Sequence, residues 1–335
     1  PGFTALGNAL QLCPRLTSLD IGGNFINKEG ATGLVPALQK CTTLRRLTAR
    51  SFRLSHSSIE AEGAAVLCVA LSKCPELERL DLGCDIGPLG ATALAGTLSH
   101  CTLMRTLELS RAHIGNEGAA ALSSSLLKCR HLTRLDLSDN SLTEAGATAI
   151  GTGLSHAQNL AELRFDFNRI EAEGAAALGT GLSRFAQCTS LTNLNLCAND
   201  VGAEGLAALL GSLRCCSSIA SLKFGDNDLC DEGAVILAES LHHFPNLLVL
   251  DLNTNNIESR GIAALALALP KCPLLKDFDL THIDLGDEHN EDDTGREAAA
   301  LLGDALSQLT MLERLSLDYA SFCDAGFAAL VSALP

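Results

Sequence analysis

The sequence predicts an α/β solenoid in which short parallel strands form one layer, helices form the other, and the stack curves into a horseshoe. A unit of about 28 residues recurs along all 335 residues, and such a period is typical of repeat architectures. Each unit opens with apolar residues at period two, as in a half-buried strand, and continues with apolar spacing typical of a short helix. Because helices are bulkier than strands, we expect strands on the concave side and helices on the convex side.

The stretch LTRLDLSDNSLTEAGATAIGTGL, which begins at Leu132, shows one such unit. The units begin at Leu16, Leu44, Leu77, Met104, Leu132, Leu160, Leu191, Ile219, Leu247, Leu275 and Leu312. The spacings between them are 28, 33, 27, 28, 28, 31, 28, 28, 28 and 37 residues. We therefore assign a partial repeat to 1–15, full repeats to 16–311 and a truncated repeat to 312–335, all in one solenoid domain. Because neither end carries a polar capping unit, we expect a segment of a longer chain.

Within a unit, the elements follow in a fixed order of strand, turn, helix and return loop. The opening LxxLxL pattern is the strand, and position fifteen is a glycine before the apolar spacing of the helix. Position nine is an asparagine in six units, where a side-chain amide can pair with backbone groups of the turn. These residues predict a ladder of Asn24, Asn140, Asn168, Asn199, Asn227 and Asn255.

The 14 cysteines indicate a protein of a reducing compartment rather than one held together by disulfides. Eight of them stand three residues before the start of a unit, a regularity that marks a packing position, since free cysteine behaves as a small buried apolar residue. The sequence also has no N-x-S/T site and neither a signal peptide nor a membrane span. We therefore expect a soluble protein of a reducing compartment, the cytoplasm first.

The net charge of −15 is unevenly distributed. Residues 1–167 hold 15 basic and 15 acidic residues, whereas residues 168–335 hold 9 basic and 24 acidic ones. An acidic surface repels nucleic acids and anionic membranes and attracts basic partners. We expect neither nucleic acid nor membrane as a partner, and a basic partner surface for the second half.

Sequence signals of catalysis are absent. The chain has no HExxH, GxGxxG, GxxxxGK[ST] or GxSxG motif and no pair of CxxC motifs, which excludes the usual signals of zinc hydrolysis, nucleotide binding and serine esterase chemistry. We expect no enzyme, no cofactor and no metal site.

Arginines gather at the strand positions that should face the concave side in the second to sixth units. Together with Phe167 as an apolar anchor, they make a candidate partner-binding surface of Arg45, Arg46, Arg50, Arg79, Arg105, Arg111, Arg134 and Arg164. Acidic residues such as Asp81, Glu108 and Asp136 occupy position five of the same units. Two interpretations stay open: an alternating lattice that keeps an exposed sheet face soluble, or guanidinium donors for a protein partner.

A second candidate is the insertion GDEHNEDDTGRE at residues 286–297. It brings together Asp287, Glu288, Glu291, Asp292 and Asp293. Such a loop is either simply solvated, or a docking loop for a basic partner, or a place of adventitious calcium binding, although it lacks the EF-hand spacing.

With the period of 28, the LxxLxLxxN strand and turn, and the EGAxAL start of the helix, the chain resembles the ribonuclease-inhibitor-type leucine-rich-repeat proteins. The resemblance covers essentially the whole chain and implies a horseshoe that recognises proteins through its concave face or loops. The chain departs from the pattern at position nine in five units, which carry Phe52, Asp85, Ala112, Ile283 and Ala320. Without tryptophan and with one tyrosine, it is not expected to inhibit ribonucleases.

Our leading hypothesis from the sequence is a non-enzymatic scaffold that holds another protein through the concave face. One alternative is a regulator of a small GTPase, because the family includes the GTPase-activating protein of Ran. A further alternative is the sensor segment of a larger receptor, or an axonemal or cytoskeletal assembly segment.

Overall fold

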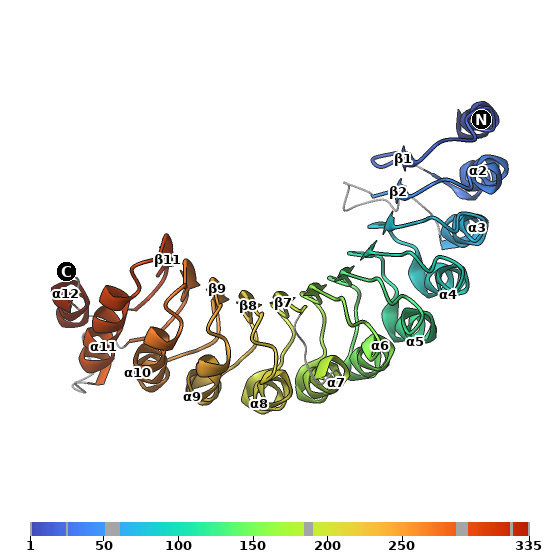
Figure 1. Ribbon diagram of the computed structural model, residues 1–335. Helices are drawn as coiled ribbons and strands as arrows, with labels where there is room; N and C mark the ends of the chain where they lie inside the picture. Colours follow the sequence, from blue (N-terminus) through green and yellow to red (C-terminus); the bar gives the residue numbers. More distant parts are fainter. Residues whose placement is uncertain are drawn as a thin grey trace. The chain divides into compact units, whose positions relative to one another are not determined.

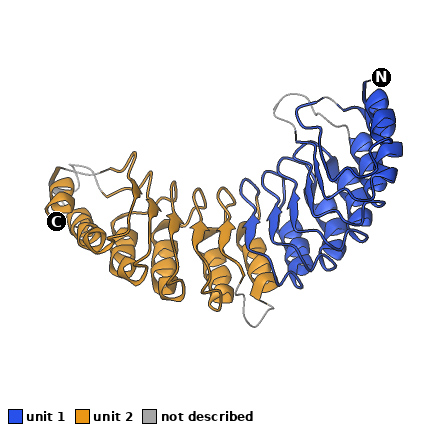
Figure 2. Ribbon diagram, turned by 45° about the horizontal axis from the view of Figure 1, so that its top comes forward, with its two compact units in different colours: residues 1–168 blue, residues 169–335 orange. Residues whose placement is uncertain are grey.

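The computed structural model describes residues 2–24, 26–50, 61–183, 190–285, 294–321 and 324–333. The chain forms two compact units, unit 1 (residues 1–168) and unit 2 (residues 169–335), which Figure 2 shows in different colours. Within each unit, a layer of short parallel strands lies beside a layer of helices (Figure 1). The predicted α/β solenoid is thereby confirmed, whereas the assignment of a single domain stays a prediction.

Unit 1 alternates helix and strand from its first described residue. Its helices are α1 (Gly2–Leu10), α2 (Lys28–Lys40), α3 (Ala61–Leu71), α4 (Gly87–Leu98), α5 (Gly115–Leu126) and α6 (Glu144–Leu154). Its strands are β1 (Ser18–Asp20), β2 (Arg46–Thr48), β3 (Arg79–Asp81), β4 (Thr106–Glu108), β5 (Arg134–Asp136) and β6 (Glu162–Arg164).

Unit 2 continues the alternation and adds two short 3₁₀ helices, η1 and η2. Its helices are α7 (Glu171–Ser183), α8 (Gly202–Leu213), α9 (Cys230–Ser240), η1 (Leu241–His243), α10 (Ser259–Ala268), η2 (Leu269–Lys271), α11 (Thr294–Gln308) and α12 (Asp324–Ala333). Its strands are β7 (Asn193–Asn195), β8 (Ser221–Lys223), β9 (Val249–Asp251), β10 (Asp277–Asp279) and β11 (Arg314–Ser316).

The strands pair in the register of the repeat, so that equivalent positions stand side by side. Leu80, Leu107 and Leu135 are direct neighbours on β3, β4 and β5, and all three are fully buried. Removing such a side chain from water stabilises the fold by roughly 1.5–3 kcal/mol. The period-two pattern of the sequence thus directs positions four and six into the core and leaves positions three and five on the opposite face.

Asparagine side chains satisfy the backbone where the chain turns after each strand. The Oδ1 atom of Asn140 accepts hydrogen bonds from the backbone N–H groups of Ala112 (3.1 Å) and Ile114 (3.2 Å). Its Nδ2 atom donates to the carbonyl oxygens of Leu109 (2.7 Å) and Ser138 (3.0 Å). Bonds of the same kind are made by the amides of Asn24, Asn168, Asn199, Asn227 and Asn255. Each of these amides therefore supplies hydrogen-bond partners that the backbone of a turning chain would otherwise lack.

The turn places the residue before the asparagine position in the left-handed region. In unit 1, this holds for Gly23, Arg111, Asp139 and Phe167, with φ angles of 70°, 59°, 54° and 57°. Left-handed backbone favours glycine, asparagine and aspartate and is uncommon for a bulky side chain. Phe167 is therefore held there by the repeat and not by its own conformational preference.

The recurring glycine at position fifteen allows neighbouring helices to approach closely. A Cβ atom added at Gly118 would lie 2.8 Å from the Cβ of Ala91, and one at Gly205 would lie 2.7 Å from the Cα of Ala172. Since real Cβ atoms do not approach so closely, a glycine is required where one helix starts against the next.

The regular cysteines fill the core beneath the return loops. Cys74, Cys101 and Cys129 are fully buried. Burial raises the pKa of Cys74 and Cys129 to about 11 and that of Cys101 to about 12. All cysteines among the described residues are free thiols. Cys13 departs from the predicted packing role, because its side chain is exposed, and Cys188 lies outside the described residues.

Candidate functional site

The side of the strands away from the helices carries the candidate site. We call it the open face and define it by the residues at positions three, five and seven of each repeat. In unit 1 these are Ser18, Asp20, Gly22, Arg46, Thr48, Arg50, Arg79, Asp81, Gly83, Thr106, Glu108, Ser110, Arg134, Asp136, Ser138, Glu162, Arg164 and Asp166. Since the strands are in register, each side chain has neighbours of equal position on the adjacent strands.

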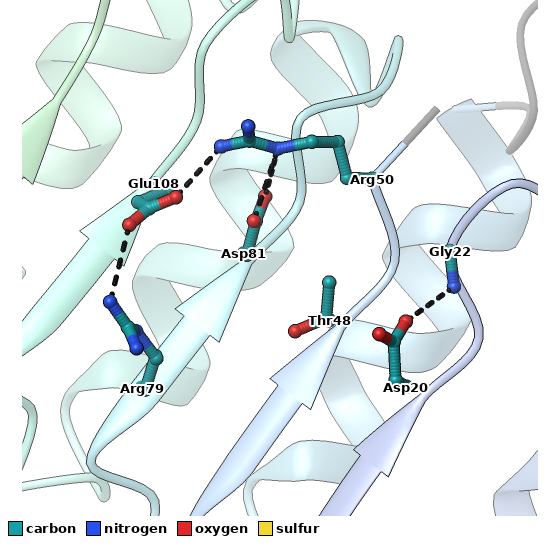
Figure 3. A pocket seen from close by; sticks show the side chains of 7 residues that line it. All are labelled: Asp20, Gly22, Thr48, Arg50, Arg79, Asp81 and Glu108. Carbon is teal, nitrogen blue, oxygen red and sulfur yellow. Dashed lines mark hydrogen bonds and ion pairs between the residues drawn. The ribbon is translucent and has the colours of Figure 1, made fainter. Parts of the chain in front are cut away.

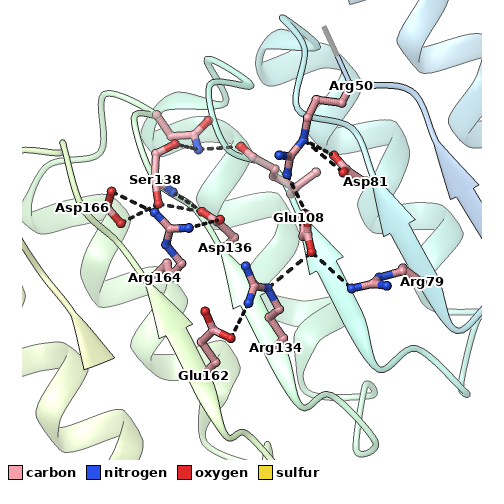
Figure 4. Close-up of polar contacts among 12 residues, drawn as sticks. Arg50, Arg79, Asp81, Glu108, Arg134, Asp136, Ser138, Glu162, Arg164 and Asp166 are labelled. Atoms are coloured by element: carbon pink, nitrogen blue, oxygen red, sulfur yellow. Dashed lines mark hydrogen bonds and ion pairs between the residues drawn. The ribbon is translucent and has the colours of Figure 1, made fainter. Parts of the chain in front are cut away.

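Glu108 on β4 is the centre of an ionic lattice on this face (Figure 4). One carboxylate oxygen of Glu108 lies 2.7 Å from Arg50 Nη2, and the other lies 3.3 Å from Arg134 Nε and 3.7 Å from Arg79 Nη2. Arg50 also pairs with Asp81, with 3.1 Å between Nε and Oδ2. Three guanidinium groups from three different repeats therefore converge on one carboxylate.

The lattice continues over β5 and β6. Arg164 lies between two carboxylates, with its guanidinium 3.6 Å from Asp136 and 3.4 Å from Asp166. The hydroxyl of Ser138 lies 2.6 Å from the Oδ1 atom of Asp136 and 2.7 Å from that of Asp166, so it bridges the two acids. At the edge of the lattice Arg134 pairs with Glu162. Sequence analysis missed the bridging serine and this edge carboxylate, because only the paired positions of neighbouring strands reveal them.

In the lattice, burial and the charges of neighbouring groups of opposite sign shift the pKa values of Glu108 and Arg164 in opposite directions. Burial, together with the negative charge of Asp81, raises the pKa of Glu108, although Arg134, Arg50 and Arg79 lower it. For Arg164, burial lowers the pKa, but Asp136 and Asp166 outweigh that effect and raise it. Arg164 on β6 is thus held firmly charged. For Glu108 on β4, the nearby arginines do not fully offset the effect of burial and of Asp81 on its pKa.

The predicted arginines divide into three groups in the structure. Arg50, Arg79, Arg134 and Arg164 belong to the lattice. Two others, Arg46 on β2 and Arg105 just before β4, have exposed side chains and form no ion pair with any described residue.

The remaining predicted residues lie beside the open face. Arg45 pairs with Glu76 at 3.2 Å, and Arg111 pairs with Asp139 at 3.3 Å. Phe167 follows β6 and is 63% exposed. The acidic residues of the predicted docking loop, Asp287, Glu288, Glu291, Asp292 and Asp293, lie outside the described residues.

A hollow of about 380 Å³ opens in this face over β1 to β4 (Figure 3). It is lined by Asp20, Gly22, Thr48, Arg50, Arg79, Asp81 and Glu108. All of these residues except Gly22 have polar or charged side chains, and the hollow shares its arginines with the lattice.

On the open face of unit 2, Arg314 pairs with Asp277 at 2.8 Å, but three further carboxylates have no such partner. Asp251, Asp279 and Asp318 form no ion pair with a described residue. Burial raises the pKa of Asp251, and the neighbouring charge of Asp279 acts in the same direction. Beside them, the rings of His282 and Tyr319 stack at 4.7 Å, and Tyr319 is 79% exposed. Sequence reasoning missed this aromatic pair, although both residues occupy position eight of consecutive repeats.

Other kinds of site find no support in the described ranges. Among these residues, no group of three His, Cys, Asp or Glu side chains could hold a metal ion. None of the described helices is both long enough and apolar enough to cross a lipid bilayer.

Parts of the chain match one known repeat family. Six segments match a family described as Leucine Rich repeat, namely residues 13–35, 100–123, 128–151, 156–179, 187–210 and 244–266. These segments fall in repeats that have the parallel strands and alternating helices described above, so the chain is similar to leucine-rich-repeat proteins.

Among solved structures, the chain is similar to an internalin from Listeria monocytogenes. The identity is 13%, the match covers 92% of this chain and 88% of that one, and the TM-score is 0.41. It is also similar to the Actin-Binding Site 2 of leiomodin-1, with 20% identity, 43% and 79% coverage, and a TM-score of 0.34. A search of the curated proteins found no match.

Proposed function

We propose that this leucine-rich-repeat chain is a non-catalytic scaffold that binds a partner protein through the open face of unit 1. The observation that carries the proposal is a sheet surface whose charged groups are already held in place by one another. A surface that is ordered before binding loses little conformational entropy when a partner arrives. The free thiols among the described cysteines support a reducing compartment, and we propose the cytoplasm.

Arg46 on the open face is proposed to contact the partner, together with Arg105 and Phe167 beside that face. The two guanidinium groups are exposed and form no ion pair within the described part of the chain, so they can bind carboxylates of a partner without breaking existing pairs. The ring of Phe167 offers apolar area beside the lattice. Aromatic and arginine side chains are enriched among residues that dominate binding energies.

For unit 2 we propose a basic region on the partner. Asp251, Asp279 and Asp318 leave negative charge on its open face, whereas the open-face acids of unit 1 other than Asp20 are paired with arginines. Tyr319 adds an exposed ring, over which a cationic side chain can lie. Charge complementarity of this kind increases association rates and lowers the affinity for partners of the wrong charge.

Affinity capture from a native cell extract, followed by mass spectrometry, tests the proposal. The chain is offered as wild type, as the double variant Arg46→Glu and Arg105→Glu, and as the control Arg130→Glu, which reverses an exposed arginine between α5 and β5. A fourth form carries Asp279→Asn and Asp318→Asn. Binding is compared at about 0.1 M and about 0.5 M salt, since screening weakens contacts between exposed charges.

The proposal predicts a partner that the wild type and the Arg130 control retain at low salt. The arginine double variant should lose that partner, and the aspartate variant should bind it more weakly. Equal recovery by wild type and the arginine double variant would contradict a site on the open face of unit 1. Equal recovery by the aspartate variant would remove only the part assigned to unit 2.

A further inference from the structure

The hollow on unit 1 exists because two repeats have no side chain at position seven. Gly22 follows β1 and Gly83 follows β3, where the units of β4 and β5 have Ser110 and Ser138. A Cβ atom at Gly83 would lie 3.3 Å from the Cγ of Arg50 and 3.4 Å from its Nε. The missing side chains therefore leave room for Arg50 to lie across the sheet, and they leave space between Arg50 and β1.

The arginines that line the hollow are already paired with the acids of β3 and β4. Arg50 pairs with Asp81 and Glu108, and Arg79 pairs with Glu108. Asp20, on the β1 side, is exposed, and among the described residues it accepts a hydrogen bond only from the backbone N–H of Gly22 at 2.9 Å (Figure 3). It forms no ion pair with a described residue. Three carboxylates and two guanidinium groups line the space, so the lining has one negative charge more than positive charges.

The raised pKa of Glu108 agrees with this excess of negative charge. Arg50, Arg79, Arg134 and Asp81 are the charged groups that face it, and the pKa of Glu108 is nevertheless raised. Burial is the main cause, and the charge of Asp81 adds to it. A further cation in the hollow would oppose both effects.

We propose that the hollow receives the lysine or arginine side chain of a partner protein, whose cationic end pairs with Asp20. A volume of about 380 Å³ admits such a side chain together with water. The hydroxyl of Thr48 makes no hydrogen bond within the described residues and is available to the incoming group. This inference rests on the proposed function, because it assigns one residue of the partner to one place on the open face.

The test uses the whole protein and two small probes, N-acetyl-arginine methylamide and its neutral counterpart N-acetyl-glutamine methylamide. The backbone N–H of Gly22 reports on the Asp20 carboxylate in an NMR titration, because the two are hydrogen-bonded. The cationic probe should shift the Gly22 resonance and lower the pKa of Glu108, and the neutral probe should do neither. Asp20→Asn should weaken binding by about fivefold, since an exposed ion pair contributes up to ~1 kcal/mol.

A matched control, Glu29→Gln, removes an exposed carboxylate on α2 of the same unit and should leave the titration unchanged. The inference is wrong if the cationic probe leaves Gly22 and Glu108 unaffected, or if Asp20→Asn and Glu29→Gln have equal effects. Because no partner is needed here, a failure of this titration leaves the capture experiment on Arg46 and Arg105 unaffected. Failure of that capture experiment would, in turn, leave the result for the hollow standing.

Discussion

Glu108 illustrates what an ionic lattice on a sheet does to a single residue. Three arginines surround its carboxylate, yet its pKa is raised because it is almost completely buried and lies near Asp81. A group with a raised pKa binds its proton more tightly in the folded than in the unfolded chain. The folded state is therefore favoured below the ordinary glutamate pKa, and this contribution is lost as the pH rises through the raised pKa.

The variant Glu108→Gln should reveal this contribution, because glutamine does not titrate. The free energy of unfolding of the wild type, taken relative to the variant, should fall as the pH rises from the ordinary glutamate pKa through the raised one. Above that range the difference should be constant. Urea unfolding of both proteins over a pH series measures it, and a difference that rises with pH would contradict the sign of the shift.

Individual residues also show the limit of sequence-based prediction. Repeat positions alone located Arg79, Arg134 and Glu108 on the correct face of the strands. They could not show that the arginines of β3 and β5 share Glu108, because that depends on side-chain directions across neighbouring strands. Nor did they separate the paired arginines from Arg46, which forms no ion pair with a described residue.

At the scale of elements, the glycine at the start of each helix sets the distance between repeats. Gly118→Ala on α5 should lower the free energy of unfolding by about 1–3 kcal/mol, because its Cβ would meet Ala91 at 2.8 Å. Gly96→Ala on α4 is the matched control, since nothing lies within 4 Å of its added Cβ. That change should instead stabilise the helix by about 0.5–1 kcal/mol.

Thermal or urea unfolding of these two variants measures the contrast. Equal effects of the two substitutions would show that the close approach of α4 and α5 does not depend on Gly118. The order and type of the elements could be predicted from the repeat, because each unit repeats the same apolar spacing. The short length of the strands could not be predicted, because the LxxLxL pattern spans six residues whereas β4 has three.

At the scale of the whole molecule, the two units differ in how they treat equivalent positions. On the open face of unit 1, every acid except Asp20 pairs with an arginine, whereas that of unit 2 leaves Asp251, Asp279 and Asp318 without such partners. The excess of acidic over basic residues in the second half of the sequence predicted the negative charge of unit 2. It did not predict the hollow, which depends on two glycines that stand on different repeats.

The central claim is that the open face of unit 1 binds a partner protein, and site-specific photo-crosslinking tests it most directly. A photoreactive amino acid is placed at Thr106, on β4 between Arg79 and Arg134, or at Thr92, on the exposed side of α4. The account predicts that the captured partner is crosslinked from position 106 and not from position 92. Crosslinking from position 92 alone would contradict it, because the partner would then lie on the helices.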